Sequence, residues 1–123
     1  METKTLEETI GKWTRREVVV PPKAKLPEFV NDWIGIAGSR QYAGLVEDVL
    51  CALYEEVEYQ ADINTDRSEG GNYAWNVKPY EDALKTIASI AGINSDQLKT
   101  IVYDKKYHMN QERRIKNGFF GHF

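Results

Sequence analysis

Three carboxylates at helical spacing are the first candidates for chemistry in this chain. Glu55, Glu58 and Asp62 fall on one side of an expected helix. An E-x-x-E pair on a helix can bind Mg²⁺ for the hydrolysis of nucleotide pyrophosphates, but that chemistry needs a second acidic pair. Glu81 and Asp82 do not supply it, because adjacent residues point apart on a helix. We therefore interpret the three carboxylates as a solvated face.

The polar segment that follows resembles a calcium loop only in its first half. Asp62, Asn64 and Asp66 alternate as the first ligands of an EF-hand loop do. The sixth position is Arg67, where glycine is needed for the bend, and the twelfth is Tyr73, where a bidentate glutamate is needed. A turn-forming polar loop explains these residues without a metal.

The remaining reactive residue types lack partners in the sequence. His108 and His122 have no cysteine nearby, so zinc-ligand spacing is missing. Gly70-Gly71 has no following lysine and no clear helix start, which a phosphate loop requires. Cys51 lies among apolar residues and is expected to be a buried, inert thiol. The sequence thus predicts no enzyme activity, no cofactor and no metal site.

Residues 84–105, LKTIASIAGINSDQLKTIVYDK, carry the strongest functional signal. They predict two short amphipathic helices joined by a turn of about three residues. Gly92 can adopt the positive φ that ends a helix, and Asn94 or Ser95 can cap the next one. The side chains expected to face inward are Ile87, Ala88, Ala91, Leu98, Ile101 and Val102.

This spacing resembles the helix-turn-helix unit of Cro-type and lac-repressor-type DNA-binding proteins. The resemblance covers residues 84–105, and residues 105–118 are loosely similar to the third-helix region of a lac-repressor-type headpiece. It implies that the second helix enters the major groove, with Gln97 reading an adenine edge and Lys99 a phosphate or guanine. Asp96 departs from this pattern, because an acid there repels phosphate. The residues implied to bind DNA are Asn94, Ser95, Gln97, Lys99, Thr100, Lys105, Lys106, Arg113 and Arg114.

The same spacing is also compatible with a purely structural role. Two helices joined by a glycine turn form an ordinary αα-hairpin, whose apolar positions pack into any helical core. The surface around residues 95–106 separates the two interpretations. An exposed basic face favours DNA, whereas a hairpin packed into the core without one favours a protein partner.

Charge and composition limit the possible partners. The 123 residues carry a net charge of -3, which argues against a general nucleic-acid coat. Residues 1–80 hold 14 acidic and 9 basic residues, whereas residues 81–123 hold 5 and 7. No apolar run approaches the length of a membrane span, and no signal peptide is visible. We expect a single soluble domain over residues 1–123 in the cytoplasm, with no membrane partner.

The rest of the chain predicts a mainly α fold with a minor β component. Helical periodicity is strongest over residues 40–61, and shorter helices are expected over residues 3–13 and from Pro27 to Gly38. The β-branched run RREVVV, ending at Val20, predicts a short strand that pairs with Tyr73–Val77. The expected fold is a compact helical domain with a short strand pair and a C-terminal helix-turn-helix-like hairpin.

Residues 18–34, VVVPPKAKLPEFVNDWI, faintly resemble the start of small uncharacterised phage proteins of Gram-positive bacteria. Combined with the hairpin, this resemblance implies a small phage or prophage regulator that binds duplex DNA. The alternative is a non-enzymatic phage protein that inhibits a host or defence protein, as an anti-CRISPR does, through its acidic face and residues 62–72. A DNA reader of this size is expected to be a homodimer that uses Arg16–Val20 or the C-terminal tail.

Overall fold

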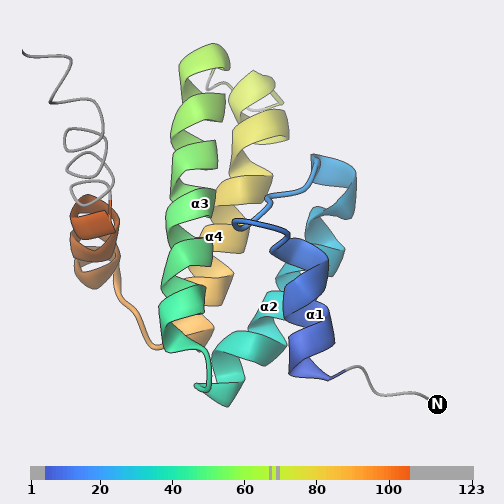
Figure 1. Cartoon of the computed structure of the whole chain (residues 1–123). Coiled ribbons are helices and arrows are strands. Elements are labelled where there is room, and N and C mark those ends of the chain that lie inside the picture. The colour runs from blue at the N-terminus through green and yellow to red at the C-terminus, as the bar shows by residue number, and fades with distance from the viewer. Residues whose placement is uncertain (1–4, 67, 69, 106–123) are drawn as a thin grey trace, which may run out of the picture.

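α-Helices dominate the computed structural model, which describes residues 5–66, 68 and 70–105 (Figure 1). The helices are α1 (Leu6–Trp13), α2 (Leu26–Ser39), α3 (Ala43–Ile63), α4 (Lys78–Ile90) and a helical stretch over residues 95–105. α3 and α4 lie side by side, with α1 and α2 on one flank in this view and residues 95–105 on the other. The mainly helical fold class is therefore confirmed.

α1 begins at Leu6, inside the predicted range of residues 3–13, and its end is attached to α2. The Thr5 hydroxyl accepts a hydrogen bond from the Glu8 amide at 3.2 Å, which caps the first turn. The buried Trp13 ring meets Phe29 of α2 edge-on, with ring centroids 5.2 Å apart. The Trp13 indole N–H donates to Asp32 at 2.9 Å, so this tryptophan is anchored by both its ring and its polar atom.

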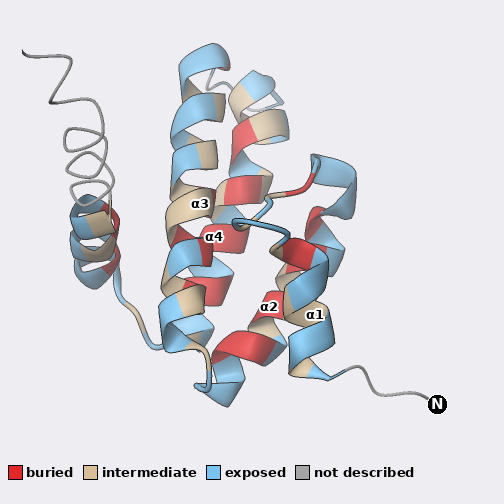
Figure 2. Ribbon diagram, viewed as in Figure 1, coloured by how far each residue is buried: buried red, intermediate tan, exposed pale blue. Residues whose placement is uncertain are grey.

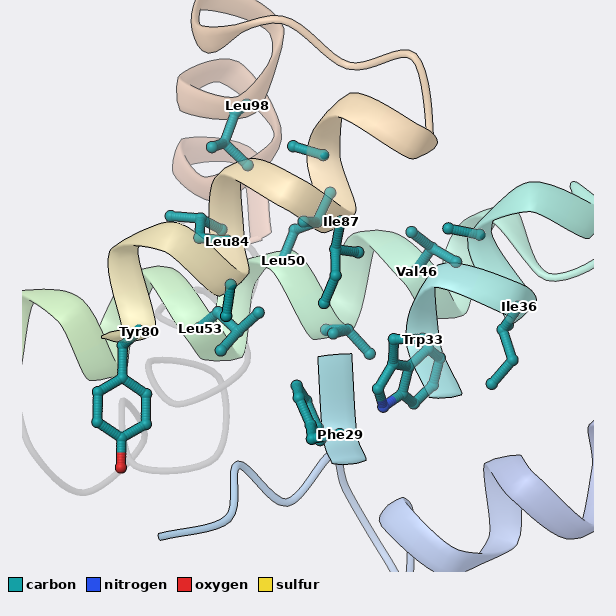
Figure 3. Close-up of a cluster of buried hydrophobic side chains, with 14 of the residues drawn as sticks. Phe29, Trp33, Ile36, Val46, Leu50, Leu53, Tyr80, Leu84, Ile87 and Leu98 are labelled. Carbon is teal, nitrogen blue, oxygen red and sulfur yellow. The ribbon is translucent and has the colours of Figure 1, made fainter. Parts of the chain in front are cut away.

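One hydrophobic core joins α2, α3, α4 and the helix at residues 95–105 (Figure 3). Its apolar positions follow the predicted three- and four-residue steps, so each helix turns one buried stripe inward (Figure 2). The largest fully buried side chains are Trp33, Phe29, Ile36, Leu50, Leu53, Ile87, Val49 and Val77. The boundaries of both helices differ slightly from prediction: α2 runs from Leu26 to Ser39 and is followed by Arg40 in a left-handed conformation at φ 60°, and α3 runs from Ala43 to Ile63.

The predicted strand pair is wrong. In the described residues the first segment shows only an isolated bridge between Thr14 and Val18, in which the chain turns back on itself. Tyr73–Val77 is a π-helix that continues into α4, with Pro79 in the first helical turn, where a proline is tolerated. The β-branched valines favour a strand by composition, but Val18 and Val20 belong to a loop that packs against the core.

Candidate functional site

The turn of the predicted hairpin has a well-defined geometry. Gly92 adopts φ 75°, and its amide donates to the Ser89 carbonyl at 3.1 Å. The Ile93 amide reaches back to the Ala88 carbonyl at 2.9 Å, so α4 ends in a Schellman motif. Ile93 then packs against the core. The sequence correctly predicted that Gly92 takes a positive φ and ends the first helix.

Asn94 begins the next helix through a reciprocal cap. Its side-chain oxygen accepts from the Gln97 amide at 2.9 Å, while the Gln97 side-chain oxygen accepts from the Asn94 amide at 3.0 Å. This capping box satisfies two amides that would otherwise lack partners at the helix start. Bidentate contact with an adenine needs both ends of the Gln97 amide, so it would require this cap to open.

The other residues implied to bind DNA are divided between two sides of the helix. Ser95, Lys99 and Thr100 are exposed. Lys105 instead forms an ion pair with Asp48 of α3, which attaches the helix to the body of the protein. Burial alone would lower the pKa of Lys105, but the ion pair outweighs it and raises that pKa. Lys106, Arg113 and Arg114 lie outside the described residues.

The outward face of the helix at residues 95–105 is not basic in its described part. It exposes one cation, Lys99, and two carboxylates, Asp96 and Asp104. The inward side holds Leu98 and Val102, which are buried in the core shared with α3 and α4. The helix thus packs along the body of the protein, and its free face presents more negative than positive charge.

A trough of about 660 Å³ lies along α3 where residues 14–20 approach it, and we call it the acidic trough. Leu45, Cys51 and Ala52 contribute half-buried apolar or thiol surface, and Val18 and Val20 line the opposite wall. The charged and polar lining residues are Thr14, Arg16, Glu17, Asp48, Glu55, Glu56, Tyr59 and Lys105. Four of these are carboxylates and two are cations, so the lining is acidic.

The charge of the acidic trough comes mainly from α3. This helix contains six carboxylates and no lysine or arginine over residues 43–63. Asp48 is paired with Lys105, and Glu56 accepts a hydrogen bond from Gln60. Within the described part of the chain, Glu17 and Glu55 make no ion pair. The absence of basic residues from α3 was visible in the sequence, but the trough itself requires residues 14–20 to meet this helix.

Cys51 lines the acidic trough without forming a reactive site. Burial raises the pKa of its thiol to about 11, and its Sγ lies 4.0 Å from the Ile101 carbonyl oxygen. The thiol is therefore protonated at neutral pH, although Cys51 is half-buried and not buried as the sequence predicted.

A second, apolar groove of about 560 Å³ lies between α2 and α4. Leu26, Val30, Ile34 and Ala83 are among its apolar lining residues. Beside it the π-helix presents Trp75, which is 64% exposed. Lys23, another lining residue, donates to the Trp75 carbonyl at 3.1 Å, and its ammonium lies 5.7 Å from the ring centroid. No sequence pattern singled out this groove.

The polar loop between α3 and the π-helix uses its side chains to fold itself. Asp66 accepts from the Ser68 hydroxyl at 2.7 Å, a contact that lowers its pKa. Asn64 is buried and bonds to Gln60 and Asn76, so its oxygen is occupied. A Cβ on Gly71 would come within 2.8 Å of Asp66, so the loop closes tightly there.

Among the described residues, no three His, Cys, Asp or Glu side chains are grouped to hold a metal ion. No helix in the same part of the chain combines the length and the apolar character needed to cross a bilayer. Comparisons with protein-family models, curated proteins and solved structures find no match to this chain.

Proposed function

We propose that this protein is a non-enzymatic binding module that recognises a basic surface of another protein through α3 and the acidic trough. The observation that carries the proposal is the charge of α3, which has six carboxylates and no basic residue and contributes three of those carboxylates to the lining of the trough. Complementary charge speeds encounter and excludes wrong partners, while the apolar lining residues supply area to bury. The resemblance of residues 18–34 to phage proteins suggests a host or defence protein as the partner.

DNA binding by residues 84–105 is the second candidate. It is favoured by the hairpin turn, where the positive φ of Gly92 and the Asn94 cap leave Ser95, Lys99 and Thr100 exposed near the start of the second helix. It ranks below protein binding because the described outward face carries one lysine and two aspartates. Phosphate contacts dominate the affinity of DNA-binding proteins, and such a face offers few of them.

One titration separates the two functions. We expect the full chain to retain a fluorescent, lysine-rich peptide at about 50 mM salt and to lose it as salt screens the charges. Replacing Glu55 with lysine should weaken retention, whereas the same charge change at Glu8 on the exposed side of α1 should not. A pool of random duplex DNA should show no retention at the same salt. Retained DNA together with unretained peptide would reverse the order of the two candidates.

A further inference from the structure

Five residues that line the acidic trough repeat at the spacing by which two α-helices pack. Leu45, Asp48, Ala52, Glu55 and Tyr59 are separated by three, four, three and four residues along α3. Such steps keep side chains in one stripe along a helix and accept the side chains of a neighbouring helix. The stripe spans 15 residues, from Leu45 to Tyr59, or roughly 21 Å at the α-helical rise.

The stripe alternates in chemistry as well as in spacing. Leu45, Ala52 and Tyr59 provide apolar or aromatic surface, and Asp48 and Glu55 provide carboxylates between them. Ala52 is the smallest of the five and stands at the centre, where it allows another backbone to come close. Asp48 already has Lys105 as its partner, so Glu55 is the stripe's available carboxylate.

The opposite wall of the trough is held in position by hydrogen bonds to backbone carbonyls. The Val19 amide donates to the Trp13 carbonyl at 2.8 Å, and the Tyr80 hydroxyl donates to the Pro21 carbonyl at 3.3 Å. This wall adds Val18 and Val20 to the apolar surface, and it carries one carboxylate, Glu17, beside one cation, Arg16. A helix lying in the trough would therefore meet Glu55 on α3 and Glu17 on the wall.

We infer that the acidic trough binds a basic amphipathic α-helix of about four turns. This inference rests on the proposed function and names the occupant of that same surface. The apolar residues of the helix cover Leu45, Ala52 and Val18, and a lysine or arginine lies between Glu17 and Glu55. Charge complementarity selects a basic partner, and the three-four spacing selects a helix over an extended chain.

Three 16-residue peptides of identical composition and charge test the inference with the full chain. In the first peptide, leucines at heptad spacing form one face of the helix, and lysines lie between the leucines on that same face. The second has the same residues permuted so that the leucines are spread around the helix. The third keeps the order of the first with one exchange. The two prolines that the first peptide carries at its termini change places with two outward-facing alanines at its centre, where the prolines break the helix. We expect the first peptide to bind at least tenfold more tightly than the other two, a ratio equivalent to about 1.4 kcal/mol.

Two variants locate the binding. Glu55→Lys should weaken the first peptide, and Ala52→Tyr, which fills the middle of the stripe, should abolish its advantage over the permuted peptide. Melting of each variant shows whether the fold is retained, and Glu8→Lys is the matched charge control. The reaction of Cys51 with a thiol reagent at about pH 9 gives a second readout, because an occupant of the trough should slow it.

The outcomes separate this inference from the proposed function. If all three peptides bind equally and Glu55→Lys abolishes that binding, the acidic trough remains a binding surface, but the inference that its occupant is a helix is overturned. Binding of none of them at about 50 mM salt overturns both. The first peptide could also keep its tenfold preference in Ala52→Tyr and leave the reaction rate of Cys51 unchanged. That result would place the bound helix outside the trough and would also overturn the inference.

Discussion

Asn94 and Gln97 cap each other at the start of the helix at residues 95–105, at distances of 2.9 and 3.0 Å between side-chain oxygen and backbone nitrogen. Replacing Asn94 with alanine removes the oxygen that satisfies the Gln97 amide. We expect the free energy of unfolding to fall by about 1 kcal/mol, measured by chemical denaturation. Ser95→Ala is the control and should have a smaller effect, because Asn94 provides the cap.

Leu98 and Lys99 are neighbours with opposite roles. Leu98 is buried in the shared core, so Leu98→Ala should destabilise the protein by roughly 2–5 kcal/mol through the cavity it leaves. Lys99 is exposed, and Lys99→Glu should leave the melting temperature nearly unchanged. If the hairpin reads DNA, Lys99→Glu also weakens duplex binding by roughly 1–3 kcal/mol. If the protein binds a protein partner instead, the unmodified chain retains no duplex, and Lys99→Glu has no duplex binding to weaken.

Two glycines should respond in opposite directions to alanine. A Cβ at Gly35 in α2 meets no atom within 4 Å, so Gly35→Ala should stabilise the protein by roughly 0.5–1 kcal/mol. Gly92 has φ 75°, where a Cβ is strained, so Gly92→Ala should cost roughly 1–2 kcal/mol. Thermal melting of both variants checks the pair. A stabilising Gly92→Ala would contradict the left-handed turn that ends α4.

Glu81 should contribute to stability in a pH-dependent way. The Tyr73 hydroxyl donates to its carboxylate at 2.6 Å and, with Lys85, holds its pKa below the usual 4.5. A carboxyl whose pKa is lowered by folding stabilises the protein above the unfolded pKa. That contribution is lost as pH falls from about 4.5 through the folded pKa. Tyr73→Phe should flatten this loss in denaturation curves between about pH 7 and pH 3, and an unchanged profile would show that the contact contributes nothing.

The helices were predictable because each depends on the spacing of apolar residues within one continuous segment. The apolar steps of α3 and the glycine turn after α4 are written within single segments, and both appear in the structure. The strand pair failed because β-branched and aromatic composition at Val18–Val20 and Tyr73–Val77 says nothing about which segments meet. The acidic trough could not be predicted for the same reason, since it forms where Val18 and Val20 approach a helix more than 20 residues later in the chain.

The charge interpretation of residues 84–105 also changes once partners are known. From sequence, Lys99 and Lys105 count equally toward a basic face. In the structure Lys105 is paired with Asp48, and Asp96 and Asp104 share the outward side with Lys99. Helical spacing predicted which residues face inward, but not which carboxylate of another helix neutralises a lysine.

We propose the acidic trough, and not the hairpin, as the binding surface. The two surfaces are distinguished by the amide chemical shifts of the isotopically labelled full chain, with the first basic peptide and the random duplex pool titrated separately at about 50 mM salt. We expect the peptide to shift the amide signals of Val18, Ala52 and Glu55, and the duplex to leave those of Asn94–Thr100 unmoved. Shifts across Asn94–Thr100 on adding the duplex, with the trough signals unchanged by the peptide, would instead assign binding to the hairpin.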